Sequence, residues 1–501
     1  MSKYLLAIDQ GTTSSRAIIY NRQLSIIAQA QQEISLHYPK AGWVEQNPEH
    51  IWHSVLQCMR HALQQAGLAA TDIAAIGISN QRETTLLWHK SSGKALHPAI
   101  VWQDRRTAAQ CQQLKDAGVE PMLQQKTGLL ADPYFSATKL QWLLDNISGA
   151  RQQAERGELC FGTVECYLLW RLSGGAVHAT DASNASRTLL FNIQQQSWDT
   201  ELLQLFNIPA AILPKVMDNA AHFATATPDL LGAAIPVLAM LGDQQAALLG
   251  QACTAEGMSK STYGTGCFAV VNTGATALNS QHKLLSTVAW RLNGQTTYAL
   301  EGSIFMAGAT VQWLRDKLGI IKHASDTEAL ARQSHYQQAE LLIPAFTGLG
   351  TPHWQPEVKA ALFGLTRDTG PAQLATAALC SVAYQSCDLL NVMRQDGIPV
   401  ACLRVDGGMT ANHWFLQALA DISQTPIARC GTSDATAFGV AFLAALQLGW
   451  YQQLTDITEL WRSDITVAPA LTPETARVLY QRWQRVTTAL IALDLAIPAS
   501  L

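Results

Sequence analysis

The sequence predicts an α/β protein built from two large domains, and three observations support this. Strand-like apolar runs and amphipathic helix patterns alternate along the whole chain. The chain has 501 residues, more than one ordinary hydrophobic core holds, so two domains are expected. Two similar strand–turn–strand segments lie about half a chain apart. Together these features indicate a duplicated α/β fold.

The first element is a hairpin near the start of the chain. Apolar residues 5–8 and 17–19 flank a polar stretch that runs from Asp9 through Gly11 to Arg16. This pattern predicts two short strands joined by a tight turn. Backbone N–H groups and hydroxyls at such a turn can bind phosphate oxygens, and Asp9 can hold a hydrated divalent cation. An ordinary surface hairpin fits the same residues equally well.

A helix and a buried strand come next. Asn47 is a suitable N-cap, Pro48 suits the first helical position, and Gly67 ends the apolar stripe between them. Residues 73–78 then read as a buried strand that runs directly into polar residues 79–84. Polar groups at the end of a buried strand are where α/β sheets usually bind ligands.

Two later segments extend the pattern of the first hairpin. Residues 261–266 repeat its Gly/Thr-rich turn before an apolar run, and residues 402–412 read as a strand, a Gly407-Gly408 turn and a helix beginning near Asn412. Paired glycines allow a ring or phosphate to approach the backbone, and a helix N-terminus favours anions. Each segment alone is typical of a packing turn. All three together predict a nucleotide bound between two halves of the fold.

Composition narrows the function classes. The 34 Lys and Arg against 38 Asp and Glu give a net charge of −4, which argues against nucleic acid and anionic membranes as partners. The ten cysteines are scattered without a C-x-x-C pair, as expected for a reducing compartment. The longest apolar window, residues 230–249, is interrupted by Pro236 and Asp243, and no signal-peptide pattern is present. We therefore expect a soluble cytoplasmic protein without membrane insertion.

The two hairpins and the Gly-Gly turn resemble the phosphate and adenosine motifs of the actin/hexokinase/Hsp70-type ATPase superfamily. Within it, the chain is similar to the glycerol kinases of the FGGY carbohydrate-kinase family from Tyr4 to about Trp450. Six segments carry this similarity: residues 77–84, 100–103, 132–135, 184–188, 242–247 and 346–350. The resemblance implies two ribonuclease H-like domains, residues 1–252 for substrate and the first phosphate loop and 253–501 for nucleotide. It also implies an active-site cleft between them.

The resemblance implies ATP-dependent phosphorylation of glycerol to glycerol 3-phosphate, with Asp243 as the general base. Local sequence also fits Asp243 as the N-cap of a helix over the residues that follow, and both roles can coexist. The substrate contacts implied for this chain are Arg82, Glu83, Trp102, Tyr134, Asp243, Gln244 and Phe268. Without the resemblance, Trp102 and Phe268 would be assigned to the core.

The resemblance also implies a nucleotide and metal site. The residues that match are Thr12, Thr13, Ser14 and Arg16 in the first phosphate loop, Thr265 in the second, Gly308 and Gln312 in the intervening helix, and Gly408 and Asn412 at the adenosine. Asp9 and Asp243 are the expected anchors for Mg²⁺, through water, because Mg²⁺ dehydrates reluctantly. Members of the family form dimers and tetramers, so a homodimer or homotetramer is expected.

Several positions depart from the family pattern. Gln355-Pro356 and Ala360 stand where the family usually has Asp-Pro and a later Gly, and Asp434 replaces the usual Glu near the adenine. Residues 226–236 lack the basic groups that hold fructose 1,6-bisphosphate in many bacterial members, so we expect no inhibition by that compound. Two alternatives stay open: a kinase for another small polyol or ketose, and a catalytically silent ATP-gated sensor of the same fold.

Overall fold

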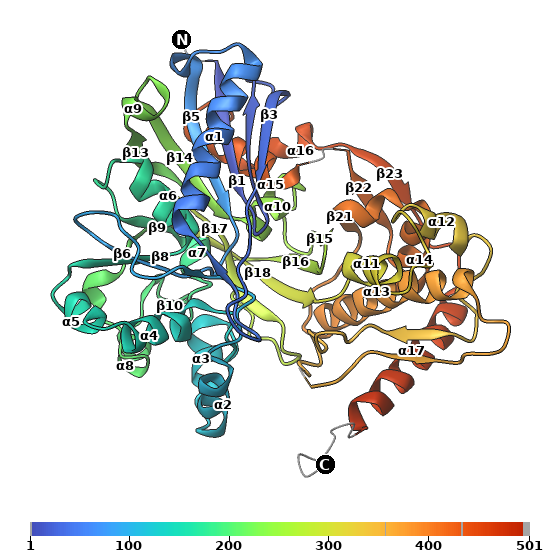
Figure 1. The fold of residues 1–501 in the computed structure, drawn as a ribbon. Coiled ribbons are helices and arrows are strands. Elements are labelled where there is room, and N and C mark those ends of the chain that lie inside the picture. Colours follow the sequence, from blue (N-terminus) through green and yellow to red (C-terminus); the bar gives the residue numbers. More distant parts are fainter. Residues whose placement is uncertain (1–2, 356, 432–433, 494–501) are drawn as a thin grey trace.

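The computed structural model describes residues 3–355, 357–431 and 434–493, and two mixed β-sheets form its framework (Figure 1). The first sheet has the strand order β13-β14-β5-β1-β2-β3. Its strands are β1 (Tyr4–Gln10), β2 (Ser14–Tyr20), β3 (Ile26–Glu33), β5 (Ile73–Asn80), β13 (Ala220–Ala226) and β14 (Ile235–Gly242). All of them come from the first half of the chain.

The second sheet has the order β17-β18-β16-β15-β21-β22-β23 and comes from the second half. Its strands are β15 (Ser259–Tyr263), β16 (Cys267–Gly274), β17 (Leu285–Leu292), β18 (Gln295–Ile304), β21 (Leu403–Asp406), β22 (Ile427–Cys430) and β23 (Ser463–Val467). Both sheets repeat one scheme. A strand pairs antiparallel with its successor and parallel with a later strand, as β1 does with β2 and β5, and as β15 does with β16 and β21. The predicted duplication is confirmed.

Short strands and helices complete the fold. The minor strands are β4 (Glu45–Gln46), β6 (Leu86–His89), β7 (Ala99–Ile100), β8 (Leu159–Gly162), β9 (Ala179–Asp181), β10 (Phe191–Asn192), β11 (Ser197–Trp198), β12 (Lys215–Met217), β19 (Leu341–Ile343) and β20 (Ala361–Phe363). The helices are α1 (Pro48–Ala66), α2 (Ala108–Asp116), α3 (Glu120–Thr127), α4 (Ser136–Asn146), α5 (Ala150–Glu155), α6 (Val164–Leu172), α7 (Ala182–Ala185), α8 (Thr200–Leu205), α9 (Pro228–Leu231), α10 (Asp243–Gly250), α11 (Gly308–Asp316), α12 (Asp326–Ala331), α13 (Pro371–Gln395), α14 (His413–Ser423), α15 (Ala435–Gln447), α16 (Ile457–Leu460) and α17 (Pro473–Ala492). Across the described ranges, every helix is too short or too polar to cross a membrane.

Helix α1 forms where its capping residues predict. The side chain of Asn47 accepts a hydrogen bond from the Glu49 amide, and Gly67 ends the helix in the left-handed conformation with φ 64°. Between the caps, Ile51, Val55 and their neighbours are buried on the side that packs against β2 and β3. Local sequence therefore determines both the ends of this helix and its buried face.

Helices α10 and α15 cross at the contact between the halves. A Cβ atom at Gly250 would lie 1.8 Å from the Ala435 carbonyl oxygen, and one at Gly439 would lie 2.1 Å from that of Ala246. Only glycine permits so close a crossing. Although α15 belongs to the second half, it packs against β1, β5 and β14 of the first sheet (Figure 1). The two halves therefore share an apolar core.

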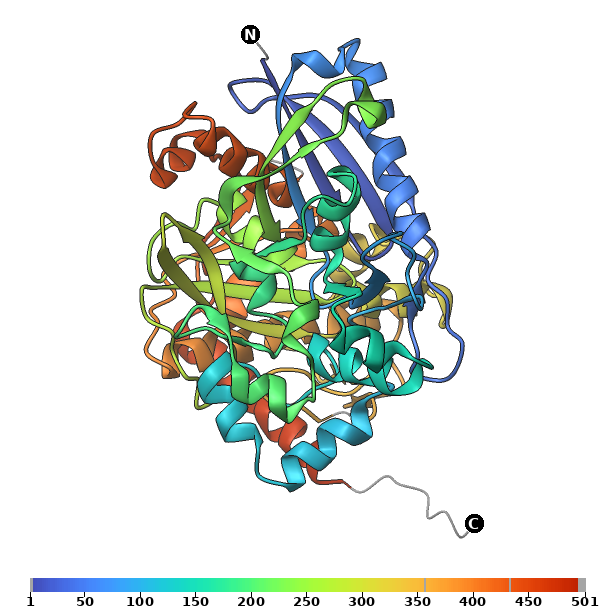
Figure 2. The same cartoon turned by 90° about the vertical axis from the view of Figure 1, so that its left-hand side faces the viewer.

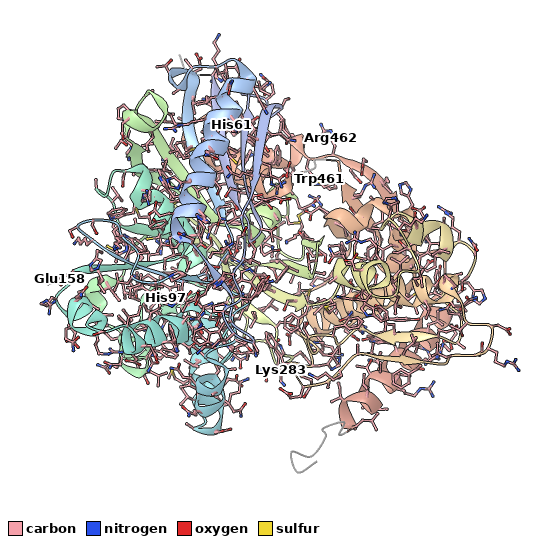
Figure 3. The ribbon with its side chains drawn as sticks, in the orientation of Figure 1. His61, His97, Glu158, Lys283, Trp461 and Arg462 are labelled. Atoms are coloured by element: carbon pink, nitrogen blue, oxygen red, sulfur yellow. The ribbon has the colours of Figure 1, made fainter. Side chains whose placement is uncertain are left out.

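Further contacts tie the second sheet to the first half of the chain. Strand β17 packs against α7, and the Tyr298 hydroxyl on β18 donates to the Ile193 carbonyl at 2.8 Å. Figure 2 shows β17 and β18 crossing the middle of the molecule. Trp461, labelled in Figure 3, donates from Nε1 to Oε1 of Gln251 at 3.1 Å, just after α10. These strands consequently bring second-half side chains to the edge of the first sheet.

Candidate active site

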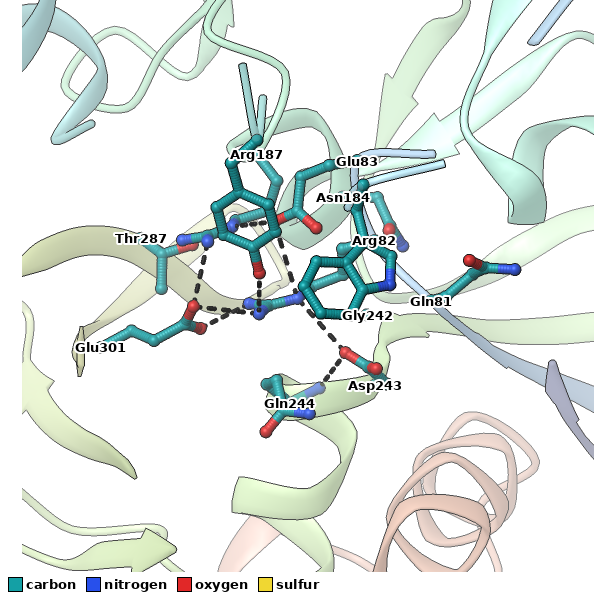
Figure 4. Close-up of polar contacts among 12 residues, drawn as sticks. Gln81, Arg82, Glu83, Asn184, Arg187, Gly242, Asp243, Gln244, Thr287 and Glu301 are labelled. Carbon is teal, nitrogen blue, oxygen red and sulfur yellow. Dashed lines mark hydrogen bonds and ion pairs between the residues drawn. The ribbon is translucent and has the colours of Figure 1, made fainter. Parts of the chain in front are cut away.

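The candidate site lies at the carboxyl ends of β5 and β14. These parallel strands are neighbours, and Asn80 at the end of β5 is paired with Gly242 at the end of β14. The residues that follow each strand, Arg82 and Asp243, consequently meet at one edge of the sheet (Figure 4). The Gly242 amide donates to the Ser183 hydroxyl at 3.0 Å, which holds the end of β14 in place.

Asp243 is the first residue of α10, and its side chain is 30% exposed. Its Oδ1 atom accepts a hydrogen bond from the Gln244 amide at 2.7 Å and lies 3.2 Å from Nε of Arg82. Burial raises the pKa of this carboxyl, while the charges of Arg82 and Lys260 oppose that shift. The expectation that Asp243 is the N-cap is wrong, because β14 continues through Gly242 and Gly242 takes the cap position.

Three aromatic rings gather beside this carboxylate. The Trp102 ring lies 5.5 Å from that of Tyr134 and 6.0 Å from that of Phe268, both in edge-to-face geometry. The Trp102 Nε1 atom donates to the Thr12 hydroxyl at 2.8 Å, which links this wall to the first hairpin. All three rings are half-buried, so they line the site instead of filling the core.

Arg82 and Glu83 lie under the rings and are almost fully buried. Glu83 has φ 60°, a left-handed conformation that is uncommon outside glycine. Its carbonyl accepts hydrogen bonds from the hydroxyls of Ser136 at 3.1 Å and Thr85 at 3.0 Å. Backbone conformations of this kind persist where surrounding contacts hold them, and they cluster at ligand sites.

Three charged residues of the site were missed by the sequence reasoning: Arg187, Lys260 and Glu301. Each is fully buried and lies in a neutral or apolar stretch of chain. A buried charge needs a partner, so a lone charge inside an apolar strand such as β18 is a usable signal. Lys260 donates to Oε1 of Gln244 and, at 3.1 Å, to the Thr262 hydroxyl. It therefore orients the amide of Gln244.

The first hairpin forms the predicted turn, with the Gly11 amide donating to the Ser14 carbonyl at 2.9 Å. Thr12, Thr13 and Ser14 lie in or beside this turn and are at least partly exposed. Arg16 is paired with Asp9 at 2.5 Å and with Asp434. The guanidinium that was expected to face phosphate is thus paired with two carboxylates, one from each half of the chain.

The remaining residues expected to bind nucleotide lie around the β15–β16 turn, on α11 and at the start of α14. The Thr265 carbonyl accepts hydrogen bonds from the Ala307 and Ala309 amides, both at 3.0 Å, at the start of α11. A Cβ at Gly308 would lie 2.6 Å from the Gly264 carbonyl oxygen, whereas Gly408 faces open space. Gln312 is exposed on α11. Asn412 caps α14 and donates to the Thr327 hydroxyl at 3.2 Å.

The donor set can accept a hydrated Mg²⁺ but does not form a cage. Within the described residues, no group of three or more His, Cys, Asp or Glu side chains is arranged to hold a metal. Asp9 and Asp243 are close enough that the charge of Asp9 raises the pKa of Asp243. One or two carboxylates that complete their shell with water and phosphate oxygens are the usual protein ligands of Mg²⁺.

The departures from the family pattern lie near the site or outside it. Asp434 pairs with Arg16, and the Gln355 amide pairs with the Leu349 carbonyl at 2.9 Å, while Pro356 lies outside the described residues. In the segment 226–236, Pro228–Leu231 forms α9. Arg60 of α1 donates to the Leu230 carbonyl there at 3.1 and 3.0 Å, a contact the sequence did not indicate. The expected lack of bisphosphate inhibition stays a prediction.

Comparisons with known proteins agree with this geometry. The chain matches the FGGY family of carbohydrate kinases, with its N-terminal domain over residues 4–250 and its C-terminal domain over residues 260–448. It is 58% identical over 484 residues to glycerol kinase 1 of Pseudomonas aeruginosa, covering 97% of this chain and 98% of that protein. It is 56% identical over 496 residues to a glycerol kinase of Rhodopseudomonas palustris, covering 98% and 99%.

Solved structures give the same result for the fold. The crystal structure of Plasmodium falciparum glycerol kinase with ADP superposes with a TM-score of 0.91 at 32% identity, covering 98% of this chain and 99% of that chain. A xylulose kinase from Lactobacillus acidophilus superposes with a TM-score of 0.88, covering 98% of this chain and 99% of that chain. Its sequence identity is 21%, so this match supports the fold alone. The two sheets repeat one scheme, and polar residues follow β5 and β14 at one edge of the first sheet. Together with these matches, this shows that the chain belongs to the FGGY family of carbohydrate kinases.

Proposed function

We propose that the protein transfers the γ-phosphoryl group of ATP to a terminal hydroxyl of glycerol, forming glycerol 3-phosphate and ADP. The observation that carries this proposal is the Asp243 carboxylate, 30% exposed, beside Arg82 and Glu83 and under three aromatic rings. Relatives named glycerol kinases, 58% and 56% identical over nearly the full chain, support the choice of substrate.

The site suits a three-carbon polyol. The faces of Trp102 and Phe268 would cover its C–H groups, while Glu83, Arg82 and Tyr134 would pair its hydroxyls. Because Lys260 engages Oε1 of Gln244, the Nε2 group of that amide is left to donate to a substrate oxygen. A site that pairs each hydroxyl rejects an analogue lacking one, since the unpaired polar groups would stay buried.

Asp243 would accept the proton of the attacking hydroxyl. As that oxygen bonds to the γ-phosphorus, the bond from phosphorus to the β,γ-bridging oxygen breaks and ADP leaves. The transition state of phosphoryl transfer is loose, so the carboxylate contributes mainly by aiming the hydroxyl in line with the leaving oxygen. Its contact with the Gln244 amide fixes that direction.

The two hairpin turns would hold the ATP phosphates. Thr12, Thr13, Ser14 and Thr265 offer hydroxyl and amide groups, while Gly408 leaves open space on the adenosine side. A bound Mg²⁺ would neutralise charge on the phosphate oxygens. Asp9 and Asp243 would hold its water shell, and Arg16 would exchange its carboxylate partners for phosphate.

We also propose the broader organisation that the family resemblance implies. Residues 1–252 and 253–501 form the two domains, whose approach would exclude water as a competing phosphoryl acceptor. The protein acts in the cytoplasm as a homodimer or homotetramer. Sedimentation at several concentrations tests the oligomeric state, and a species that stays monomeric throughout would contradict it.

A coupled ADP-release assay tests the function. With ATP and Mg²⁺, glycerol should support rapid turnover, whereas propane-1,2-diol should react about 10⁴-fold more slowly in kcat/KM. A small panel of ketoses and longer polyols provides the comparison. A higher kcat/KM for any of these would identify a kinase for another sugar, and no ADP release with any acceptor would favour the silent sensor.

The pH profile gives an independent check on Asp243. Burial raises its pKa above the ordinary value of 3.8, and only the ionised form can accept a proton. We therefore expect kcat/KM to fall as pH decreases, with a midpoint above 3.8. Circular dichroism at each pH would separate this loss from unfolding. A midpoint at or below the ordinary value in the folded protein would contradict the assignment of the acid limb to Asp243.

A further inference from the structure

Four buried charges form a closed ring beneath the proposed substrate site (Figure 4). Arg82 donates from Nη1 to Oε2 of Glu301 at 2.6 Å and from Nη2 to Oε1 at 3.0 Å. Arg187 donates from Nη2 to Oε1 of Glu301 at 3.0 Å and from Nε to Oε1 of Glu83 at 2.6 Å. Glu83 closes the ring, because its Oε1 lies 3.9 Å from Nε of Arg82.

The ring is deeply buried and electrically balanced. Its side chains are between 0% and 2% exposed, and two guanidinium groups face two carboxyl groups. Burial opposes ionisation of Glu301, but Arg187 and Arg82 outweigh it and lower its pKa to about 2. Glu301 therefore carries a full negative charge at neutral pH.

Glu301 determines which edge of Arg82 faces the catalytic carboxylate. Both terminal nitrogens of the guanidinium donate to Glu301. Nη1 also donates to Oε1 of Gln245 at 3.2 Å and Nη2 to the Tyr134 hydroxyl at 3.4 Å, so Nε is the nitrogen that faces Oδ1 of Asp243, at 3.2 Å. A guanidinium without this restraint pairs with a carboxylate through two parallel hydrogen bonds, which is its preferred geometry. Such a pair would engage Oδ2 as well as Oδ1, so a substrate hydroxyl would have to share its acceptor oxygen with a guanidinium N–H.

We propose that Glu301 is a positioning residue that holds Arg82 edge-on to Asp243 and thereby keeps that carboxylate available as the base. The proposal rests on the function proposed above for the same site. Glu301 belongs to β18 of the second sheet, where its strand neighbours in register are the apolar Val270 and Leu285. Its carboxylate therefore makes hydrogen bonds to Arg82 of the first half, while its neighbours in the second sheet are apolar.

The test is Glu301→Gln, which keeps the side-chain shape but removes the charge and one acceptor. When Arg82 turns toward Asp243, kcat/KM for glycerol should fall about 10²-fold. KM for ATP should stay unchanged.

Two comparisons separate positioning from a merely structural effect. Asp388→Asn removes another buried carboxylate of the second half, which accepts hydrogen bonds from Tyr480 and Trp483, and should leave kcat/KM for glycerol unchanged in the folded protein. In an Arg82→Met background, Glu301→Gln should cause no further loss of kcat/KM, because the residue through which it acts is gone. Additive losses would overturn the proposal.

A crystal structure of the Glu301→Gln protein distinguishes failure of this inference from failure of the proposed function, since it requires no substrate. The expected result is two nitrogen–oxygen contacts between Arg82 and Asp243. A guanidinium that keeps its single Nε contact would overturn the inference even if glycerol is the substrate. Conversely, a wild-type protein that does not phosphorylate glycerol would refute the proposed function. The crystal structure of the variant would still test the position of Arg82 independently.

Discussion

Asp243→Asn is expected to lower kcat for glycerol phosphorylation by about 10²–10⁴-fold. The amide cannot accept the hydroxyl proton, although it has nearly the same shape. Its oxygen can still accept the hydrogen bonds now made by the Gln244 amide and Arg82 Nε, so the start of α10 should be retained. Steady-state ADP release measures the loss, and calorimetric titration with ATP measures whether nucleotide binding survives.

Asp145→Asn is a suitable control for this variant. Asp145 is 47% exposed and pairs with Arg151 on the surface of the first half, so its neutralisation should leave kcat unchanged. If Asp243→Asn turned over glycerol at the wild-type rate, another group would have to be the base. A fall in kcat that accompanied loss of the folded structure would show damage to α10 instead of lost catalysis.

Arg187→Met is expected to destabilise the protein by about 3–5 kcal/mol, the usual cost of removing one partner from a buried ion pair. Arg187 is fully buried, and its guanidinium binds Glu83 and Glu301 while lying 5.5 Å from the centre of the Tyr134 ring. Methionine fills part of the volume but leaves both carboxylates short of a cation. Urea unfolding followed by circular dichroism measures the difference.

Two further variants give the range within which this loss of stability should fall. Arg187→Lys keeps the charge but cannot reach both carboxylates with a rigid fork, so we expect an intermediate loss. Arg477→Met removes a cation that is 55% exposed and paired with Glu474 on α17, and it should unfold like the wild type. Equal stability of Arg187→Met and the wild type would mean that the ring contributes nothing net to folding.

Local chemistry explains what could be predicted from the sequence. The caps of α1, the turn between β1 and β2, and the helix after Asn412 all depend on residues within a few positions of one another. The one local error concerned Asp243, which was expected as the N-cap. It arose because the pairing of β14 with β5 extends one residue further, through Gly242.

The candidate site residues were expected from the resemblance to the family motifs. Strand order explains why two of them meet, since parallel strands place their carboxyl ends at one edge of a sheet. Arg82 and Asp243 follow β5 and β14 and meet there, and Trp102, Tyr134 and Phe268 pack beside them. The motifs indicate which residue types are present, and the parallel pairing of β5 with β14 places Arg82 and Asp243 at the same edge of the sheet.

The amino-acid sequence alone thus predicts the duplicated α/β fold, both ends of α1, the start of α14, the turns of the two hairpins and the polar groups at the ends of β5 and β14. Which buried charges pair depends on how distant segments pack in three dimensions. Glu301 lies 219 residues from Arg82, and Asp434 lies 418 residues from Arg16. A local pattern indicates that a buried charge needs a partner, but the partner's identity depends on which strands and helices pack together. In this protein, the crossing of α10 with α15 and the position of β18 determine which charged residues come into contact.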